Sequence, residues 1–143
     1  MNNFPIQFNK IVSANTTILA ANTNRYGIDN GNTKLLFKSQ APTGTKINGI
    51  TAKALGTNVA TVLRLFLSKT DLLNKIDNTN TILINETTLA ATTATATAIL
   101  TNNIISYSTD TTRFIIPTGW CLYVTLGTAV AAGYHIAFFG ADY

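Results

Sequence analysis

Short stretches with apolar residues at every second position recur along this chain, and segments rich in glycine, proline or asparagine occur between several of them. In residues 61–67 (TVLRLFL), for example, leucine occupies alternate positions. A period of two places such residues on one face of a β-strand. Further strands are expected at residues 6–14, 16–21, 34–38, 46–55, 81–85, 112–116, 120–126 and 134–143. Strands that recur roughly every 8 to 12 residues with turn signals between them predict an all-β fold, an antiparallel β-sandwich of about eight strands.

The composition supports a β-rich domain. Of the 143 residues, 25 are Thr, 16 are Asn and 15 are Ile, whereas only 11% are charged. Thr and Ile are branched at Cβ and suit a pleated, half-buried surface. A hydrophobic content of 46% excludes a disordered chain, and the length fits one domain.

Four segments depart from the strand pattern. Residues 22–33 hold four Asn and two Gly, which predicts a loop. Residues 41–44 (APTG) and 117–119 (PTG) predict turns. In residues 69–80, three apolar side chains follow Thr70 at helical spacing, which predicts a loop with one helical turn and Thr70 as a candidate N-cap.

Residues 87–99 are low in complexity, and residues 93–98 alternate strictly between Thr and Ala. We expect a strand there, with a threonine face and an alanine face. A helix is the alternative, because Ala favours helices.

Residues suited to catalysis or metal binding are few and scattered. Cys121 is the only cysteine, which excludes an internal disulfide, and His135 is the only histidine. The pair could act as nucleophile and general base, but a small core cysteine and a strand histidine are the simpler interpretation. The acidic residues are dispersed, and no phosphate-binding loop or nucleophile elbow is present. The sequence therefore predicts a non-enzymatic protein with no metal and no other cofactor.

Charge and hydropathy narrow the range of partners. The ten Lys and Arg residues give a net charge of +4 but occur singly, so no specific nucleic-acid groove is expected. No stretch approaches the roughly 20 apolar residues that span a bilayer, and no signal peptide is recognisable, so no membrane partner is expected. A stacking platform for sugars could come from aromatic residues, although packing in the core is the simpler interpretation. They are Tyr107, Tyr123, Tyr134, Tyr143 and Trp120.

Three segments, taken in order, carry a resemblance. They are residues 50–67 (ITAKALGTNVATVLRLFL), 116–127 (IPTGWCLYVTLG) and 135–143 (HIAFFGADY). This succession resembles small virion proteins of tailed bacteriophages, over roughly residues 44 to 143. The matching positions are Val62, Arg64, Leu65, Phe66, Pro117, Gly119, Leu122, Val124, Gly140, Asp142 and Tyr143. The tail departs from the family pattern, because Gly140-Ala141 stands where two glycines are expected.

The resemblance implies a jelly-roll-like sandwich and a structural role in a virion. The implied protein is an auxiliary capsid (decoration) protein on the outer surface of the head, which stabilises the head or anchors fibres. The implied partners are the major capsid protein, other virion proteins and further copies of this chain, with a trimer as one option. The implied location is the capsid surface, after assembly in the host cytoplasm. A carbohydrate- or receptor-binding module of a phage fibre or tail is the alternative.

The resemblance leaves the N-terminal part uncovered, so we divide the chain into an N-terminal arm and loop (residues 1–33) and a β-sandwich domain (residues 34–143). Apolar side chains in the arm lie among Asn and Thr, as in a segment that docks by strand addition. The expected contacts with the capsid or a neighbouring copy are Phe4, Ile6, Phe8, Ile11 and Ile18.

Overall fold

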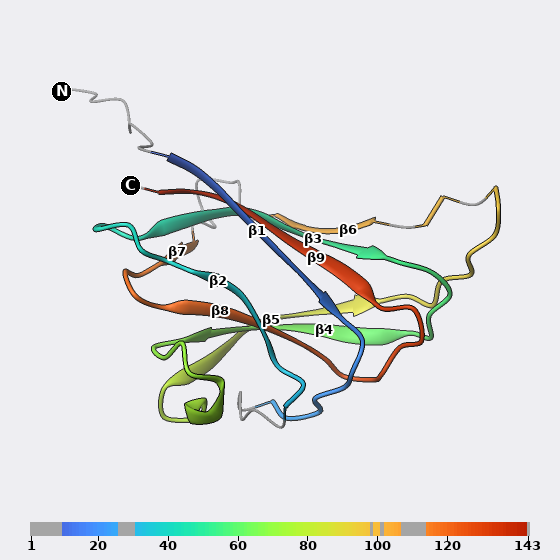
Figure 1. The fold of residues 1–143 in the computed structure, drawn as a ribbon, viewed down its shortest axis with the longest axis horizontal. Helices are drawn as coiled ribbons and strands as arrows, with labels where there is room; N and C mark the ends of the chain where they lie inside the picture. The colour runs from blue at the N-terminus through green and yellow to red at the C-terminus, as the bar shows by residue number, and fades with distance from the viewer. Residues whose placement is uncertain (1–9, 26–30, 98, 101, 107–113, 143) are drawn as a thin grey trace.

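Two antiparallel β-sheets pack face to face (Figure 1). This computed structural model describes residues 10–25, 31–97, 99–100, 102–106 and 114–142. Sheet A has the order β1 (Lys10–Ile18), β9 (Tyr134–Asp142), β3 (Thr45–Ala54) and β6 (Asn102–Ser106), and β7 (Phe114–Ile116) also pairs with β3. Sheet B has the order β2 (Lys34–Lys38), β8 (Cys121–Leu126), β4 (Thr61–Ser68) and β5 (Thr81–Leu89). The predicted antiparallel sandwich is confirmed.

The strands pair as they do in a jelly roll. β1 pairs with β9, β2 with β8, β3 with β6 and β7, and β4 with β5, so the pairs are nested along the chain. This antiparallel ribbon curls until β9 lies beside β3 and β8 lies beside β4. The result is the double Greek key of a jelly roll. Because β6 and β7 share one place beside β3, the nine described strands fill eight positions.

Inward-facing apolar side chains of both sheets form one core. The leucines at alternate positions of β4 belong to it, together with Ile50, Ile136 and Phe138 of sheet A. Full burial of such a side chain contributes about 1.5–3 kcal/mol. The period-two pattern of the sequence therefore corresponds to the core face of the strands.

The predicted turns at residues 41–44 and 117–119 are present. Gly44 N donates to Ala41 O at 3.1 Å, and Trp120 N donates to Pro117 O at 3.0 Å. Gly44 has φ +95°, and a Cβ there would lie 2.7 Å from the Ile116 carbonyl oxygen. Glycine is thus the residue that this turn requires.

The predicted helical turn in residues 69–80 is the short 3₁₀ helix η1 (Leu73–Lys75). Thr70 is not its N-cap: the position is occupied by Leu72, which makes no side-chain capping bond. The Thr70 hydroxyl instead accepts from Leu72 N at 3.2 Å, in a turn that precedes the helix. No helix in the described part of the chain has the length and apolarity needed to cross a membrane.

Other sequence expectations need correction. Residues 10–18 form one continuous strand rather than parts of two extended pieces, because all nine residues pair with β9.

The strand expected at residues 93–98 is absent from its described residues, and the helical alternative is absent there too. In Figure 1 this part of the chain crosses from β5 in sheet B to β6 in sheet A at one end of the sandwich. Its alanine face is too small to add much to a core, whereas the topology requires a crossing there. β6 itself was not predicted, because its NNIIS sequence lacks the alternating pattern.

Candidate interaction surfaces

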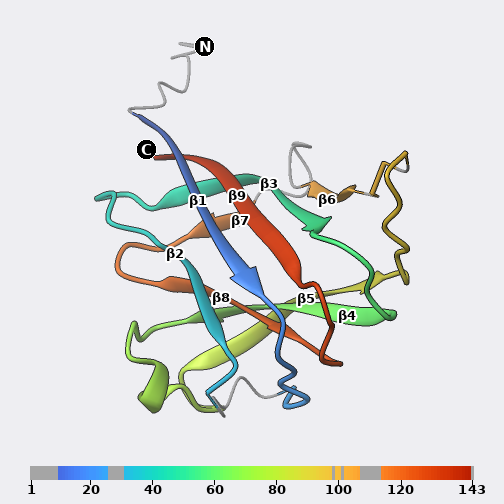
Figure 2. The ribbon, with the colours of Figure 1, turned by 45° about the vertical axis from the view of Figure 1, so that its right-hand side comes forward.

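Two loops of the same chain cover part of the outer face of sheet B. Residues 69–80 lie on the side of sheet B that faces away from sheet A (Figures 1 and 2). Ile76 from this loop packs with Phe66, Cys121 and Tyr123 in a small second core. The Tyr123 hydroxyl donates to the Thr70 carbonyl at 2.8 Å, which fixes the loop to β8. The loop therefore removes Phe66, Cys121 and Tyr123 from contact with a partner, whereas Leu35 of β2 is still 39% exposed on this face.

The second loop includes Asn22 and Arg25, and it is fixed by the nearly buried Arg64. Arg64 of β4 donates from Nε to Glu86 Oε1 at 2.7 Å and from Nη1 to the Asn22 carbonyl at 3.2 Å. Arg25 Nε lies 3.5 Å from the same Glu86 oxygen. The hydrogen bond from Arg64 lowers the pKa of Glu86 below its ordinary value. Arg64, one of the positions of the family resemblance, thus has a structural role.

The outer face of sheet A is covered by no described segment, and we call it the open face. Strand register aligns Ile11 of β1 with Ala141 of β9, Lys46 of β3 and Ile115 of β7. The next row places Phe139 between small residues on both neighbouring strands. Ile11 is 85% exposed and Phe139 49% exposed. Exposed apolar side chains that gather on one face typically mark an interaction site.

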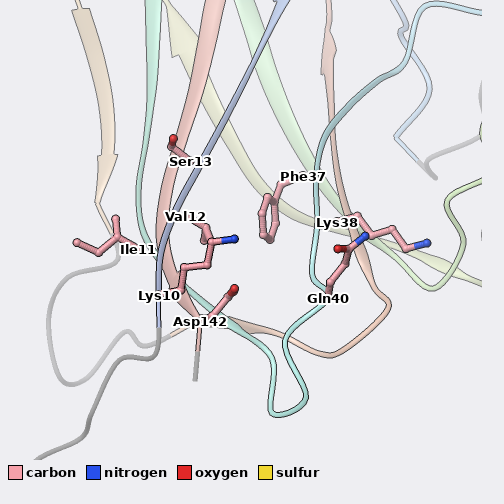
Figure 3. A pocket seen from close by; sticks show the side chains of 8 residues that line it. All are labelled: Lys10, Ile11, Val12, Ser13, Phe37, Lys38, Gln40 and Asp142. Carbon is pink, nitrogen blue, oxygen red and sulfur yellow. The ribbon is translucent and has the colours of Figure 1, made fainter.

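A hollow of about 290 Å³ lies between the start of β1 and the end of β2 (Figure 3). The side chains of Val12 and Phe37 form an apolar part of its wall, and Lys10, Gln40 and Asp142 form a polar part. The described residues that line it are Lys10, Ile11, Val12, Ser13, Phe37, Lys38, Gln40 and Asp142. Sequence analysis missed this site because its residues are far apart in the chain and no motif joins them.

The residues expected to contact the capsid fall in three different places. Phe4, Ile6 and Phe8 lie outside the described residues. Ile11 projects from the open face, as a contact residue should. Ile18 is fully buried in the core and so cannot touch a partner in the folded chain.

The aromatic platform suggested by the sequence is not assembled. Tyr123 and Tyr134 are fully buried, on opposite sheets. Burial raises the pKa of Tyr134, whose hydroxyl donates to the Ala90 carbonyl at 3.3 Å. Trp120 is partly buried against the core, with Lys69 Nζ 5.5 Å from its ring centroid. Tyr107 and Tyr143 lie outside the described residues.

Cys121 and His135 are not brought together. Cys121 lies under the 69–80 loop on the outer side of sheet B, and burial raises the pKa of its thiol. His135 pairs with Thr17 and Lys53 on the open face of sheet A. The thickness of the sandwich separates the two side chains, so they cannot form a nucleophile and base. Within the described residues, no group of three or more His, Cys, Asp or Glu side chains could hold a metal ion.

Comparisons of this chain with protein-family models, with curated proteins and with solved structures gave no significant match.

Proposed function

We propose that this protein is a non-enzymatic structural protein of a tailed-phage virion, an auxiliary capsid protein that binds the outer surface of the head and stabilises it or anchors fibres. The observation that carries the proposal is the contrast between its two outer faces. Loops of the same chain cover the apolar cluster around Phe66 and Tyr123 on one face, whereas the other face presents Ile11, Phe139, Ile104 and Ile115 to solvent. A fold with one such face suits attachment to a surface.

The sequence resemblance and the jelly-roll topology support the same role, although a fold by itself does not specify a function. The partners that we propose are the major capsid protein and other virion proteins, together with further copies of this chain in an oligomer such as a trimer. Many identical weak contacts on a symmetric shell would add to firm binding. Attachment would also cover the strand edges that a sandwich leaves open.

We assign the contact to the open face and to the apolar residues of the preceding arm, Phe4, Ile6 and Phe8. These three alternate with other residues, which is the pattern needed for strand addition to a neighbour's sheet. Lys53 projects from the open face, and no carboxylate of the described residues does so. The partner surface should therefore combine apolar side chains with carboxylates.

The first test is the number of copies of this chain per purified particle, measured by quantitative mass spectrometry against the major capsid protein. Hundreds of copies are expected for a decoration protein. A few tens or fewer would move it to a vertex, fibre or tail, and its absence from particles would overturn the proposal.

A second test identifies the contact surface. Purified Phe139→Ser protein is added to particles that lack the chain, with Leu72→Ser as the matched control. Leu72 has a similar exposure, 51%, but lies in the loop that covers sheet B. We expect at least tenfold fewer bound copies for Phe139→Ser and no change for Leu72→Ser. Equal binding of the two variants would exclude the open face as the contact.

A further inference from the structure

The hollow at the β1–β2 end of the sandwich has an apolar wall and a polar wall, and the polar wall is formed by Lys10, Gln40 and Asp142. Its volume of about 290 Å³ is at the lower end of the range for ligand pockets, sufficient for one six-membered ring. It lies at the end of the sandwich where Lys10 of β1 pairs with Asp142 of β9. Figure 3 shows Phe37 and Gln40 approaching the same space from the β2 side.

The Phe37 ring is held in a fixed orientation. It stacks on Phe138 with a centroid separation of 4.4 Å and an interplanar angle of 22°. Phe138 is itself fully buried in the core. A ring supported in this way offers its remaining surface to a ligand with little loss of conformational entropy.

The Asp142 carboxylate is fixed by a chain of hydroxyl groups. Thr45 Oγ1 donates to Asp142 Oδ1 at 2.6 Å, and Ser39 Oγ lies 2.9 Å from Thr45 Oγ1. Because the Thr45 proton is directed to Asp142, the Ser39 hydroxyl donates to Thr45. Thr45 and Ser39 are fully buried, so this arrangement cannot swing into solvent. Asp142 Oδ2 makes no hydrogen bond within the described chain and can accept one from a ligand.

Among the described residues that line the hollow, the charges balance. Lys38 is held by Asp71, with 2.6 Å between Nζ and Oδ2. The remaining charges are the ammonium of Lys10 and the carboxylate of Asp142, on adjacent strands. The Gln40 amide adds uncharged donor and acceptor groups. Such a site favours a ligand without net charge that carries several hydroxyl groups and one apolar face.

We propose that the hollow binds one neutral pyranose sugar unit, with the C–H face of the sugar on Phe37 and its hydroxyl groups on Asp142, Lys10 and Gln40. Asp142 accepts from ring hydroxyls, and Lys10 donates to them. A ligand with a net charge gains little net attraction, because Lys10 and Asp142 act on it in opposite directions. The proposal does not depend on the virion role, because it concerns the isolated protein.

The test is an NMR titration of the isotope-labelled full chain with the methyl glycosides of glucose, galactose, mannose and N-acetylglucosamine. A single small ligand in a site of this size should bind with a millimolar Kd, so concentrations up to about 50 mM suffice. We expect saturable shifts of the amides around the hollow, in residues 10–13 and 37–40, for at least one glycoside. No saturable shift with any of the four overturns the proposal, as does binding of acetate or glycine without binding of a glycoside.

Two variants locate the site. Asp142→Asn keeps an acceptor for Thr45 but removes the charge, and Lys10→Met removes the donor. Each should weaken the affinity for the glycoside at least tenfold. Lys53→Met is the matched control, because Lys53 is exposed on the open face, outside the hollow, and it should leave the affinity unchanged. Unchanged affinity in both Asp142→Asn and Lys10→Met would place the sugar elsewhere and overturn the proposal.

Discussion

Two buried threonines, Thr45 and Thr125, differ in whether their hydroxyl groups find hydrogen-bond partners. The Thr45 hydroxyl donates to Asp142 and accepts from Ser39, so its burial is compensated. The Thr125 hydroxyl is equally buried but has no hydrogen-bond partner within the described chain. A buried hydroxyl without a partner loses its hydrogen bonds to water and forms none in the protein, which lowers the free energy of unfolding.

We therefore predict that Thr125→Val stabilises the protein by about 1 kcal/mol, because valine keeps the shape of threonine and suits a strand. Thr45→Val is the matched control and should destabilise it by about 1–3 kcal/mol, because it leaves Ser39 and Asp142 without their partner. Urea denaturation measures both changes. A loss of stability in Thr125→Val comparable with that in Thr45→Val would contradict this interpretation.

Glu86 makes stability depend on pH. The hydrogen bond from Arg64 lowers the pKa of Glu86 from its ordinary value of 4.5. A carboxyl group whose pKa is lower in the folded chain favours folding above its unfolded pKa, and this contribution disappears as the pH falls through the folded pKa. We predict that Glu86→Gln lowers the urea midpoint at pH 7 and that the difference from wild type vanishes in acid, below the folded pKa of Glu86. A difference that persists unchanged in acid would show that packing, not charge, is responsible.

At the level of elements, β1 is part of the sheet rather than a detachable arm. All nine of its residues pair with β9, and Ile18 at its end is fully buried. An edge strand of this kind shields the next strand from water and from other chains. The arm expected from the sequence thus includes a strand of the fold.

Two deletions test this arrangement. Removal of residues 2–9 should preserve cooperative unfolding and the strand pairing, because it leaves β1 and its pairing with β9 intact. Removal of residues 2–18 should abolish cooperative unfolding, because it deletes an edge strand and opens the core at Ile18. Thermal unfolding followed by circular dichroism distinguishes the two, and a stable, cooperative product of the longer deletion would contradict the assignment of β1.

For the molecule as a whole, the main asymmetry is between its two outer faces. Phe66 and Phe139 both project away from the central core, one on each face. Phe66 is 1% exposed under the 69–80 loop, whereas Phe139 is 49% exposed. The same residue type therefore contributes to folding on one face and is available for binding on the other.

This asymmetry predicts unequal effects of two phenylalanine truncations. Phe66→Ala should destabilise the protein by about 3–5 kcal/mol, as expected for truncation of a buried aromatic side chain. Phe139→Ala should change stability by less than about 1 kcal/mol, because it sits on an exposed surface. Chemical denaturation of the two variants side by side is the measurement. Similar losses in both would mean that the open face is already covered in solution, for example by a second copy.

The sequence by itself determined the strands and turns that depend on local chemistry. The strand at residues 61–67 and the turn at Gly44 each depend on residues that are close together in the sequence. Both could therefore be predicted from the sequence. Only the tertiary structure decided which faces are covered, that residues 93–98 cross between sheets, and that Lys10, Phe37 and Asp142 border one hollow. These features depend on pairing between distant segments, where a shift of one residue in register reverses the face of every side chain.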